Sequence, residues 1–209
     1  MSENQTPSDQ QPRALSEGGE EILDGSDALA AALIELERHI GQAGWDQAPR
    51  LFALVNTDSM LAAEPQLATQ LGLRGSAEGG HPDALTAVEQ DQFRPGEDLL
   101  ADLSTIFWPE TVFGCALSLE STFLPSGADA DIPDDPALAA AYVAQHEQRL
   151  ELRVVMGVDR AGNTHGVARL RNDPDELLGS PDLVPGLTEA LAQTLTDPED
   201  SASDQEGQQ

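Results

Sequence analysis

The segment Leu150–Arg171 constrains the fold most, because it carries the clearest β-hairpin pattern in the chain. β-Branched and apolar residues flank Asp159–Asn163, whose Asp, Gly and Asn residues suit a tight turn. Neighbouring side chains in a strand point to opposite faces, so each strand here has an apolar or small face and a charged face. The pattern predicts an antiparallel sheet with one packed face and one wet face. On the packed face, Gly166 and Ala168 would let a helix approach closely.

Further strands are expected, because an isolated hairpin is only marginally stable in water. Thr111–Phe123 repeats the division into two faces, and Arg50–Asn56 is apolar on both faces, which indicates a covered or central strand. Apolar spacing and capping residues predict helices at 27–41, 97–108, 137–148 and 186–195, with shorter helical stretches at 58–63, 66–71 and 87–92. We therefore predict an α+β fold with two layers: a small, mostly antiparallel sheet of about four strands, with helices packed chiefly on one face.

The ends of the chain differ in composition from its middle. Residues 1–26 and 197–209 are polar and acidic and bury too little apolar surface to offset the entropy of ordering, so we predict two disordered acidic tails. The remaining residues, 27–196, have the length of one domain. Within them, Gly72–Ala84 is rich in glycine and lacks periodicity, which predicts a mobile loop; whether it closes over a site is left open.

Charge and composition exclude several classes of protein. The net charge is −28, and all ten basic residues are arginine, so binding to nucleic acid or to anionic lipid is disfavoured and a partner should be basic. No run of about 18 apolar residues suggests a membrane span. A single cysteine and a first segment without an apolar stretch favour a cytoplasmic location.

No residue pattern specifies a chemistry. The four histidines, His39, His81, His146 and His165, show neither paired nor cysteine-flanked spacing for a metal. Cys115 falls on the apolar face of its strand, where a thiol is usually inert. Nucleotide-binding and hydrolase motifs are missing from the sequence. We predict no catalytic residue, no metal site and no cofactor.

One set of residues forms a candidate ligand site on the charged face of the hairpin. It comprises Arg153, His165, Arg169 and Arg171. Guanidinium groups present a planar fork to carboxylate or phosphate, so these side chains could bind an anion. The favoured alternative is that the arginines pair across strands with Glu120 and Glu151, as surface ion pairs that contribute little to stability.

Three stretches carry a family resemblance: GWDQAPRLFALVNT (Gly44–Thr57), FWPETVFGCAL (Phe107–Leu117) and PDLVPGLTEALAQTL (Pro181–Leu195). Together they resemble an uncharacterised protein family of actinobacteria, over about residues 27–196. The resemblance implies a bacterial cytoplasmic protein and supplies no catalytic residues. Without a chemical motif, we expect a non-catalytic interaction protein, adaptor-like or chaperone-like, that uses the open sheet face or an exposed helix stripe. The alternative is a small-anion binder or an enzyme that uses the arginine and histidine patch on the open face.

Overall fold

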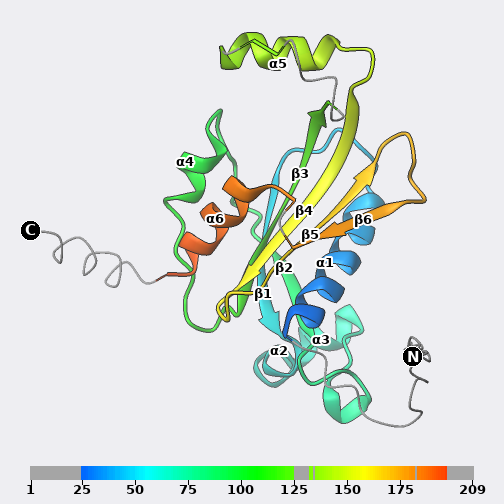
Figure 1. The fold of residues 1–209 in the computed structure, drawn as a ribbon. Helices are drawn as coiled ribbons and strands as arrows, with labels where there is room; N and C mark the ends of the chain where they lie inside the picture. Colours follow the sequence, from blue (N-terminus) through cyan, green and yellow to red (C-terminus); the bar gives the residue numbers. More distant parts are fainter. Residues whose placement is uncertain (1–24, 125–131, 134, 182, 197–209) are drawn as a thin grey trace, which may run out of the picture.

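A six-stranded antiparallel sheet organises the computed structural model, which describes residues 25–124, 132–133, 135–181 and 183–196 (Figure 1). The strands are β1 (Arg50–Asn56), β2 (Leu85–Glu89), β3 (Gly114–Phe123), β4 (Leu150–Asp159), β5 (Thr164–Leu170) and β6 (Leu177–Ser180). Their order is β2-β1-β3-β4-β5-β6, and every neighbouring pair is antiparallel. The α+β class and the hairpin are confirmed. The predicted tails lie outside the described residues, except that Gly25 and Ser26 begin the first helix.

The sheet has six strands rather than about four, because two short edge strands escaped the sequence analysis. β6 lies in the connection after the hairpin and pairs with β5. β2 replaces the helical turn predicted at 87–92. The two residues with capping-box spacing use their side chains elsewhere: the Thr86 hydroxyl lies 2.9 Å from that of Thr57, and Glu89 accepts from Arg50 at 2.7 Å. Pairing with β1 therefore outweighs a local helical signal.

The helices are α1 (Gly25–Gly41), α2 (Thr57–Ala63), α3 (Pro65–Leu71), α4 (Leu99–Leu103), α5 (Pro136–Gln145) and α6 (Pro185–Thr194), with a 3₁₀ turn η1 (Ser76–Glu78). Most match the predicted ranges. α4 is much shorter than the predicted helix at 97–108. Just after it, the hydroxyls of Ser104 and Thr105 donate to carbonyls one turn back, at Ala101 and Asp102. Such side-chain bonds to the backbone compete with continuation of a helix.

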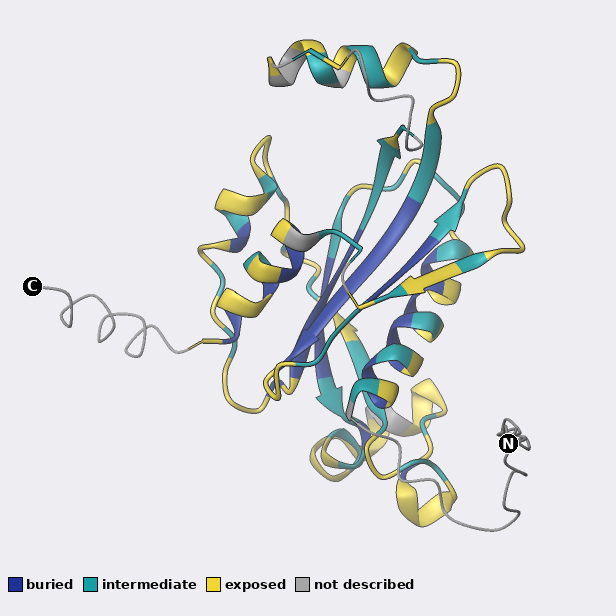
Figure 2. Ribbon diagram, in the orientation of Figure 1, coloured by how far each residue is buried: buried dark blue, intermediate teal, exposed yellow. Residues whose placement is uncertain are grey.

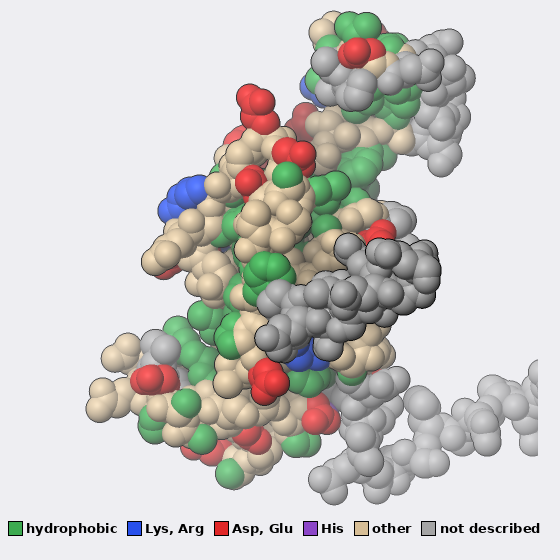
Figure 3. Space-filling view, turned by 90° about the vertical axis from the view of Figure 1, so that its left-hand side faces the viewer, with side chains coloured by type: hydrophobic (Ala, Val, Ile, Leu, Met, Phe, Trp, Pro, Cys, Tyr) green, Lys and Arg blue, Asp and Glu red, His purple; other side chains and the backbone are tan. Residues whose placement is uncertain are grey.

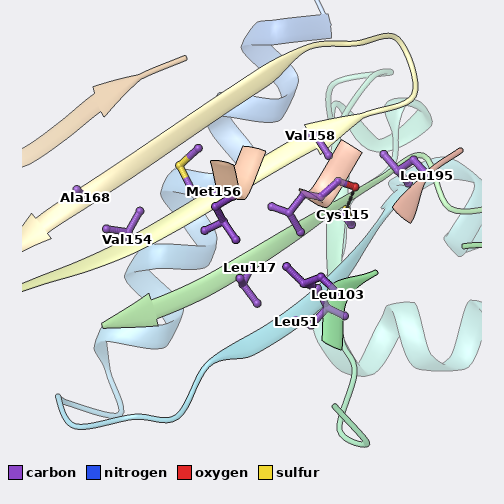
Figure 4. Packing of buried hydrophobic residues seen from close by; sticks show 11 residues of the cluster. Leu51, Leu103, Cys115, Leu117, Val154, Met156, Val158, Ala168 and Leu195 are labelled. Carbon is purple, nitrogen blue, oxygen red and sulfur yellow. Dashed lines mark hydrogen bonds between the residues drawn. The ribbon is translucent and has the colours of Figure 1, made fainter. Parts of the chain in front are cut away.

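Helices cover both faces of the sheet (Figures 1 and 2). On one face, α1 contributes Leu29, Leu33, Leu36 and Ile40, which pack on Phe52, Leu54, Ala116, Val155 and Val167. On the other face, α4 and α6 contribute Leu103, Leu187, Leu191 and Leu195, which pack on Leu51, Leu117, Val154 and Met156 (Figure 4). The prediction of two layers with one open sheet face is therefore wrong.

The reason lies in the middle of β4. The face predicted to be wet is charged at its two ends, at Glu151 and Arg153 and at Asp159; its middle carries Val155 and Gly157. A Cβ atom at Gly157 would lie 2.8 Å from a methyl group of Leu33, so the glycine allows α1 to pack directly on the strand. Burying the apolar middle of this face stabilises the fold more than leaving the face in solvent, despite its charged residues.

α5 lies beyond the ends of β3 and β4, away from the body of the domain (Figure 1). Leu138 is 61% exposed and Ala141 is also exposed, so the helix predicted at 137–148 does not bury these residues in the core. The apolar residues of this helix are mostly alanines spread around its circumference, so they do not form one stripe that a core could bury.

Hydrogen bonds tie the Gly72–Ala84 loop to the start of α2. The backbone N–H of Ser76 donates to Asp58 at 2.8 Å, and the Ser76 hydroxyl donates to the same carboxylate at 2.5 Å. At the far end of the loop, the Asn56 amide donates to the carbonyl of Pro82 at 3.1 Å. The mobility predicted for this segment stays a prediction, but its shape is defined by these contacts.

Candidate functional site

Arg153 and Arg169, two of the predicted ligand-binding residues, lie beneath α1 and pair with one buried carboxylate. Glu37 of α1 is fully buried, and its two oxygens accept from Arg169 at 2.8 and 2.7 Å. The guanidinium of Arg153, only 1% exposed, lies 3.6 Å from Glu37 and 3.1 Å from Glu120. It also donates to the carbonyl of Gly44. Glu37 and Arg153 are enclosed between α1 and the sheet, so this buried ion cluster has a structural role, although Arg169 remains partly exposed.

Arg171 lies at the open end of the same cluster. It donates to both carboxylate oxygens of Asp46, at 2.9 and 3.0 Å, and to Glu151 at 3.0 Å. The hydrogen bond and charge of Arg171 hold the pKa of Asp46 below its ordinary value. The ring of Trp45 stacks against two guanidinium groups, 4.5 Å from that of Arg153 and 5.5 Å from that of Arg171. Arg153 pairs with Glu120 and Arg171 with Glu151 as expected, but the first pair is largely buried rather than at the surface, and Arg169 pairs with Glu37 instead.

His165 lies on β5, and burial lowers the pKa of its imidazole. It lies next to β6, where a Cβ atom at Gly179 would be 3.6 Å from its Nε2. Of the four predicted residues, Arg171 borders a cavity of about 290 Å³, whose charged lining is otherwise Asp46, Glu120 and Glu151. Three carboxylates around one guanidinium would repel an anion, so the geometry does not favour anion binding there.

Glu37 and Trp45 were not among the predicted site residues. Glu37 follows Leu33 by four residues and precedes Ile40 by three. Both spacings place it on the buried face of the helix. Trp45 follows the last turn of α1 and packs on arginines from the hairpin. The sequence signal for the cluster was a glutamate at the helical spacing of apolar residues, in a chain whose hairpin carries several arginines.

An aromatic groove opens on the opposite side of the sheet. Figure 3 shows hydrophobic side chains scattered over the side of the molecule that carries α4 and α6. We define the groove by Leu51, Phe93, Ile106, Phe107 and Trp108, which line a cavity of about 490 Å³. Leu51 belongs to the buried core, whereas Phe107 is 55% exposed. The indole N–H of Trp108 donates to the Thr194 hydroxyl at 3.0 Å, which fixes this ring against α6.

The charged residues in the lining of the aromatic groove are Arg94 and Asp102. Along the segment that builds most of its wall, residues 90–110, there are five carboxylates and one arginine. The arginine, Arg94, donates to the carbonyl of Phe93 at 2.7 Å. One carboxylate, that of Asp102, is held by the backbone N–H of Gly96 at 2.5 Å, and Asp91 and Glu110 are exposed. The groove therefore combines an apolar floor with one cationic and one anionic lining residue, on a segment that is acidic overall.

Cys115 lies in the core near this groove and provides a pH-dependent prediction. Its side chain is fully buried, 3.4 Å from the Thr194 hydroxyl, and burial raises the pKa of the thiol to about 11. At pH 8 only about one native thiol in a thousand is ionised, so we expect alkylation by iodoacetamide to require unfolding. In the unfolded chain the thiol ionises near its ordinary pKa of 9.0, so this group's contribution to stability falls as pH rises from about 9 to 11.

The measurement is the alkylation rate of Cys115 as a function of pH, with and without urea. A native rate at pH 8 equal to that of an unstructured peptide thiol would contradict the assignment of Cys115 to the core. A matching rate in urea is the internal control, because the unfolded chain exposes the same thiol.

Metal-ligating side chains do not gather in the part of the chain that the structure describes: no three His, Cys, Asp or Glu residues there form a group that could hold a metal ion. Among the same residues, no helix is both long enough and apolar enough to cross a membrane.

Comparison with known proteins gives one match. A family model described as "PPA1309-like protein" matches residues 29–196, which include both the buried ion cluster and the aromatic groove. No curated protein and no solved structure matches the chain.

Proposed function

The chain belongs to the PPA1309-like protein family, and we propose that it is a non-catalytic interaction protein that binds a basic, apolar segment of a protein partner in the aromatic groove. The uncharacterised family predicted from the sequence is confirmed; its actinobacterial origin stays an expectation. The observation that carries the proposal is the exposure of Phe107 beside Trp108 and Phe93 in one groove. Both sheet faces are covered by helices, so the groove takes the place of the open face as the expected interface.

The energetics favour a binding role for this groove. Burying an aromatic side chain contributes about 1.5 to 3 kcal/mol, and interface residues that dominate affinity are often aromatic. The floor is rigid, because Leu51 belongs to a central strand and Trp108 is hydrogen-bonded to α6. A partner side chain that enters the groove therefore gains apolar contact without a large cost for ordering the site.

Charge selects the class of partner. The acidic segment 90–110 and the net charge of −28 attract a partner segment that carries lysine or arginine next to its apolar side chains. The face of an exposed aromatic ring such as Phe107 also attracts a cation. A second copy of this chain fits poorly, because two strongly acidic surfaces repel each other.

The test is a selection of peptides from a random display library on the immobilised protein, followed by affinity measurements on the selected sequences. We expect them to combine aromatic or large aliphatic residues with Lys or Arg. Phe107→Ser should weaken their binding at least about tenfold, which corresponds to about 1.4 kcal/mol, and added salt should weaken it further.

Leu100→Ser is the matched control. Leu100 lies on α4 and is 50% exposed, nearly as much as Phe107, but it does not line the groove. We expect affinity within about twofold of the wild-type value for this variant. Acidic selected peptides, or equal losses for both variants, would overturn the proposal.

A further inference from the structure

We propose a second, separate binding site: the cavity enclosed by α1, the Gly72–Ala84 loop and the start of β2 binds a small carboxylic acid, zwitterionic amino acids included. The cavity measures about 430 Å³. Its lining comprises Ala28, Ala31, Ala32, Glu35, Thr57, Gly72, Leu73, Arg74, Gly80, His81, Ala84, Leu85 and Thr86. In Figure 1 this region lies at the end of the domain where α1 begins, beside α2 and α3.

The walls of this cavity are defined by contacts within the chain. The loop is held through the bonds from Ser76 to Asp58, which lower the pKa of that carboxyl. It turns back on itself where the N–H of Gly80 donates to the carbonyl of Gly75 at 2.8 Å. A Cβ atom at Gly80 would lie 2.3 Å from the carbonyl oxygen of Arg74, so no other residue fits this turn. The cavity is therefore a feature of the loop's fold.

Arg74 supplies a cation without a carboxylate partner. Among the described residues, no Asp or Glu oxygen lies within ion-pair distance of its guanidinium, unlike those of Arg50, Arg153 and Arg169. Arg74 is an exposed residue that borders the cavity, so its guanidinium, which lacks an internal counter-ion, can turn its planar fork toward a bound carboxylate.

His81 supplies a ring N–H donor. Its Nδ1 accepts from the backbone N–H of Asp83 at 3.2 Å, which in the neutral ring places the proton on Nε2. Two hydroxyls in the lining, those of Thr57 and Thr86, lie 2.9 Å apart and can each offer or accept one further hydrogen bond. These groups suit the oxygens of a carboxylate or a hydroxyl.

The rest of the lining limits the class of ligand. Alanines, Leu73 and Leu85 fit a compact apolar body, and about 430 Å³ holds a small molecule only. Glu35 is the one carboxylate of the lining, and the whole chain is strongly acidic, so a polyanion such as a nucleotide is disfavoured. A ligand with one negative charge fits a lining that holds one arginine and one carboxylate. A zwitterion could also place its ammonium near Glu35.

The experiment uses three probes that share a branched skeleton: 4-methylpentanoate, L-leucine and 3-methylbutylamine. Each is titrated into the full ¹⁵N-labelled chain and followed by amide chemical shifts, with inorganic phosphate as a fourth probe. We expect saturable shifts in the loop for the two carboxylates, and none for the amine or for phosphate. Arg74→Gln should weaken carboxylate binding at least tenfold, and Ala31→Leu, which fills the cavity from an exposed helix position, should also weaken it.

Arg38→Gln is the matched control, because Arg38 lies exposed on α1 outside the lining and should leave binding unchanged. Unperturbed spectra away from the loop show that each variant is folded. Three results would overturn the proposal: no saturable shift with either carboxylate, binding of the amine as strong as that of the carboxylates, or unchanged affinity in Arg74→Gln. None of them bears on the aromatic groove, which shares no residue with this cavity.

Discussion

Replacing Glu37 with glutamine will lower the free energy of unfolding by about 3 to 5 kcal/mol, the usual cost of breaking a buried ion pair from one side. Glu37 is fully buried between α1 and the sheet, where it pairs with Arg169 through two hydrogen bonds and with Arg153 at 3.6 Å. Glutamine keeps the shape but removes the charge. Arg153 would then retain only Glu120 as a counter-ion, while its Nε already lacks a hydrogen-bond partner among the described residues.

Urea unfolding followed by circular dichroism measures this loss. An unchanged slope of the unfolding free energy against urea concentration would show that the variant and the wild type expose the same surface on unfolding. Glu35→Gln makes the same chemical change two residues away at an exposed position of α1, and should change stability by less than about 0.5 kcal/mol. If Glu37→Gln and Glu35→Gln were equally stable, the buried ion cluster would not be what holds α1 on the sheet.

Replacing Arg160 with alanine will lower the free energy of unfolding by about 2 to 3 kcal/mol, because hydrogen bonds from a charged group are worth more than neutral ones. From the turn between β4 and β5, its guanidinium donates to the carbonyls of Val112 and Trp108, both at 2.9 Å, and to those of Leu195 and Pro109. The bond to Leu195 also places a positive charge at the C-terminal end of α6. One side chain thus connects the hairpin, the last helix and the wall of the aromatic groove.

Because Trp108 belongs to that wall, its fluorescence should also change in Arg160→Ala, together with the stability. Arg160→Lys keeps the charge but cannot reach carbonyls in several directions at once, so we expect an intermediate loss. Arg149→Ala removes a solvent-exposed ion pair with Glu151 and should cost less than about 0.5 kcal/mol. A loss for Arg160→Ala no greater than that for Arg149→Ala would contradict this role.

The fold could be predicted where local pattern and packing agree. The hairpin, β1, α1 and α6 all follow from alternating or helical spacing of apolar residues that are buried in the structure. β2 could not be predicted in this way, because Thr86 and Glu89 carry a helical signal and strand formation depends on pairing with β1. Edge strands gain most of their stability from a neighbour that the local sequence does not contain.

The candidate site could be predicted only in part. The pairing of Arg153 with Glu120 follows from strand alternation, but the third member, Glu37, comes from a helix far away in the sequence. The aromatic groove combines Leu51 of β1 with Phe93 and with residues after α4, a juxtaposition that depends on tertiary packing. The cavity beside Arg74 likewise depends on how the glycine-rich loop folds against α1.

Site-specific photo-crosslinking in the native host tests the central claim most directly. A benzophenone amino acid is placed at position 107 in the groove, and in a second protein at position 100 on the outer side of α4; crosslinked peptides are identified by mass spectrometry. The interaction account predicts that position 107 captures one partner through a segment that combines apolar residues with Lys or Arg, and that position 100 does not capture it. Equal capture of the same proteins at both positions, or an acidic captured segment, would contradict it.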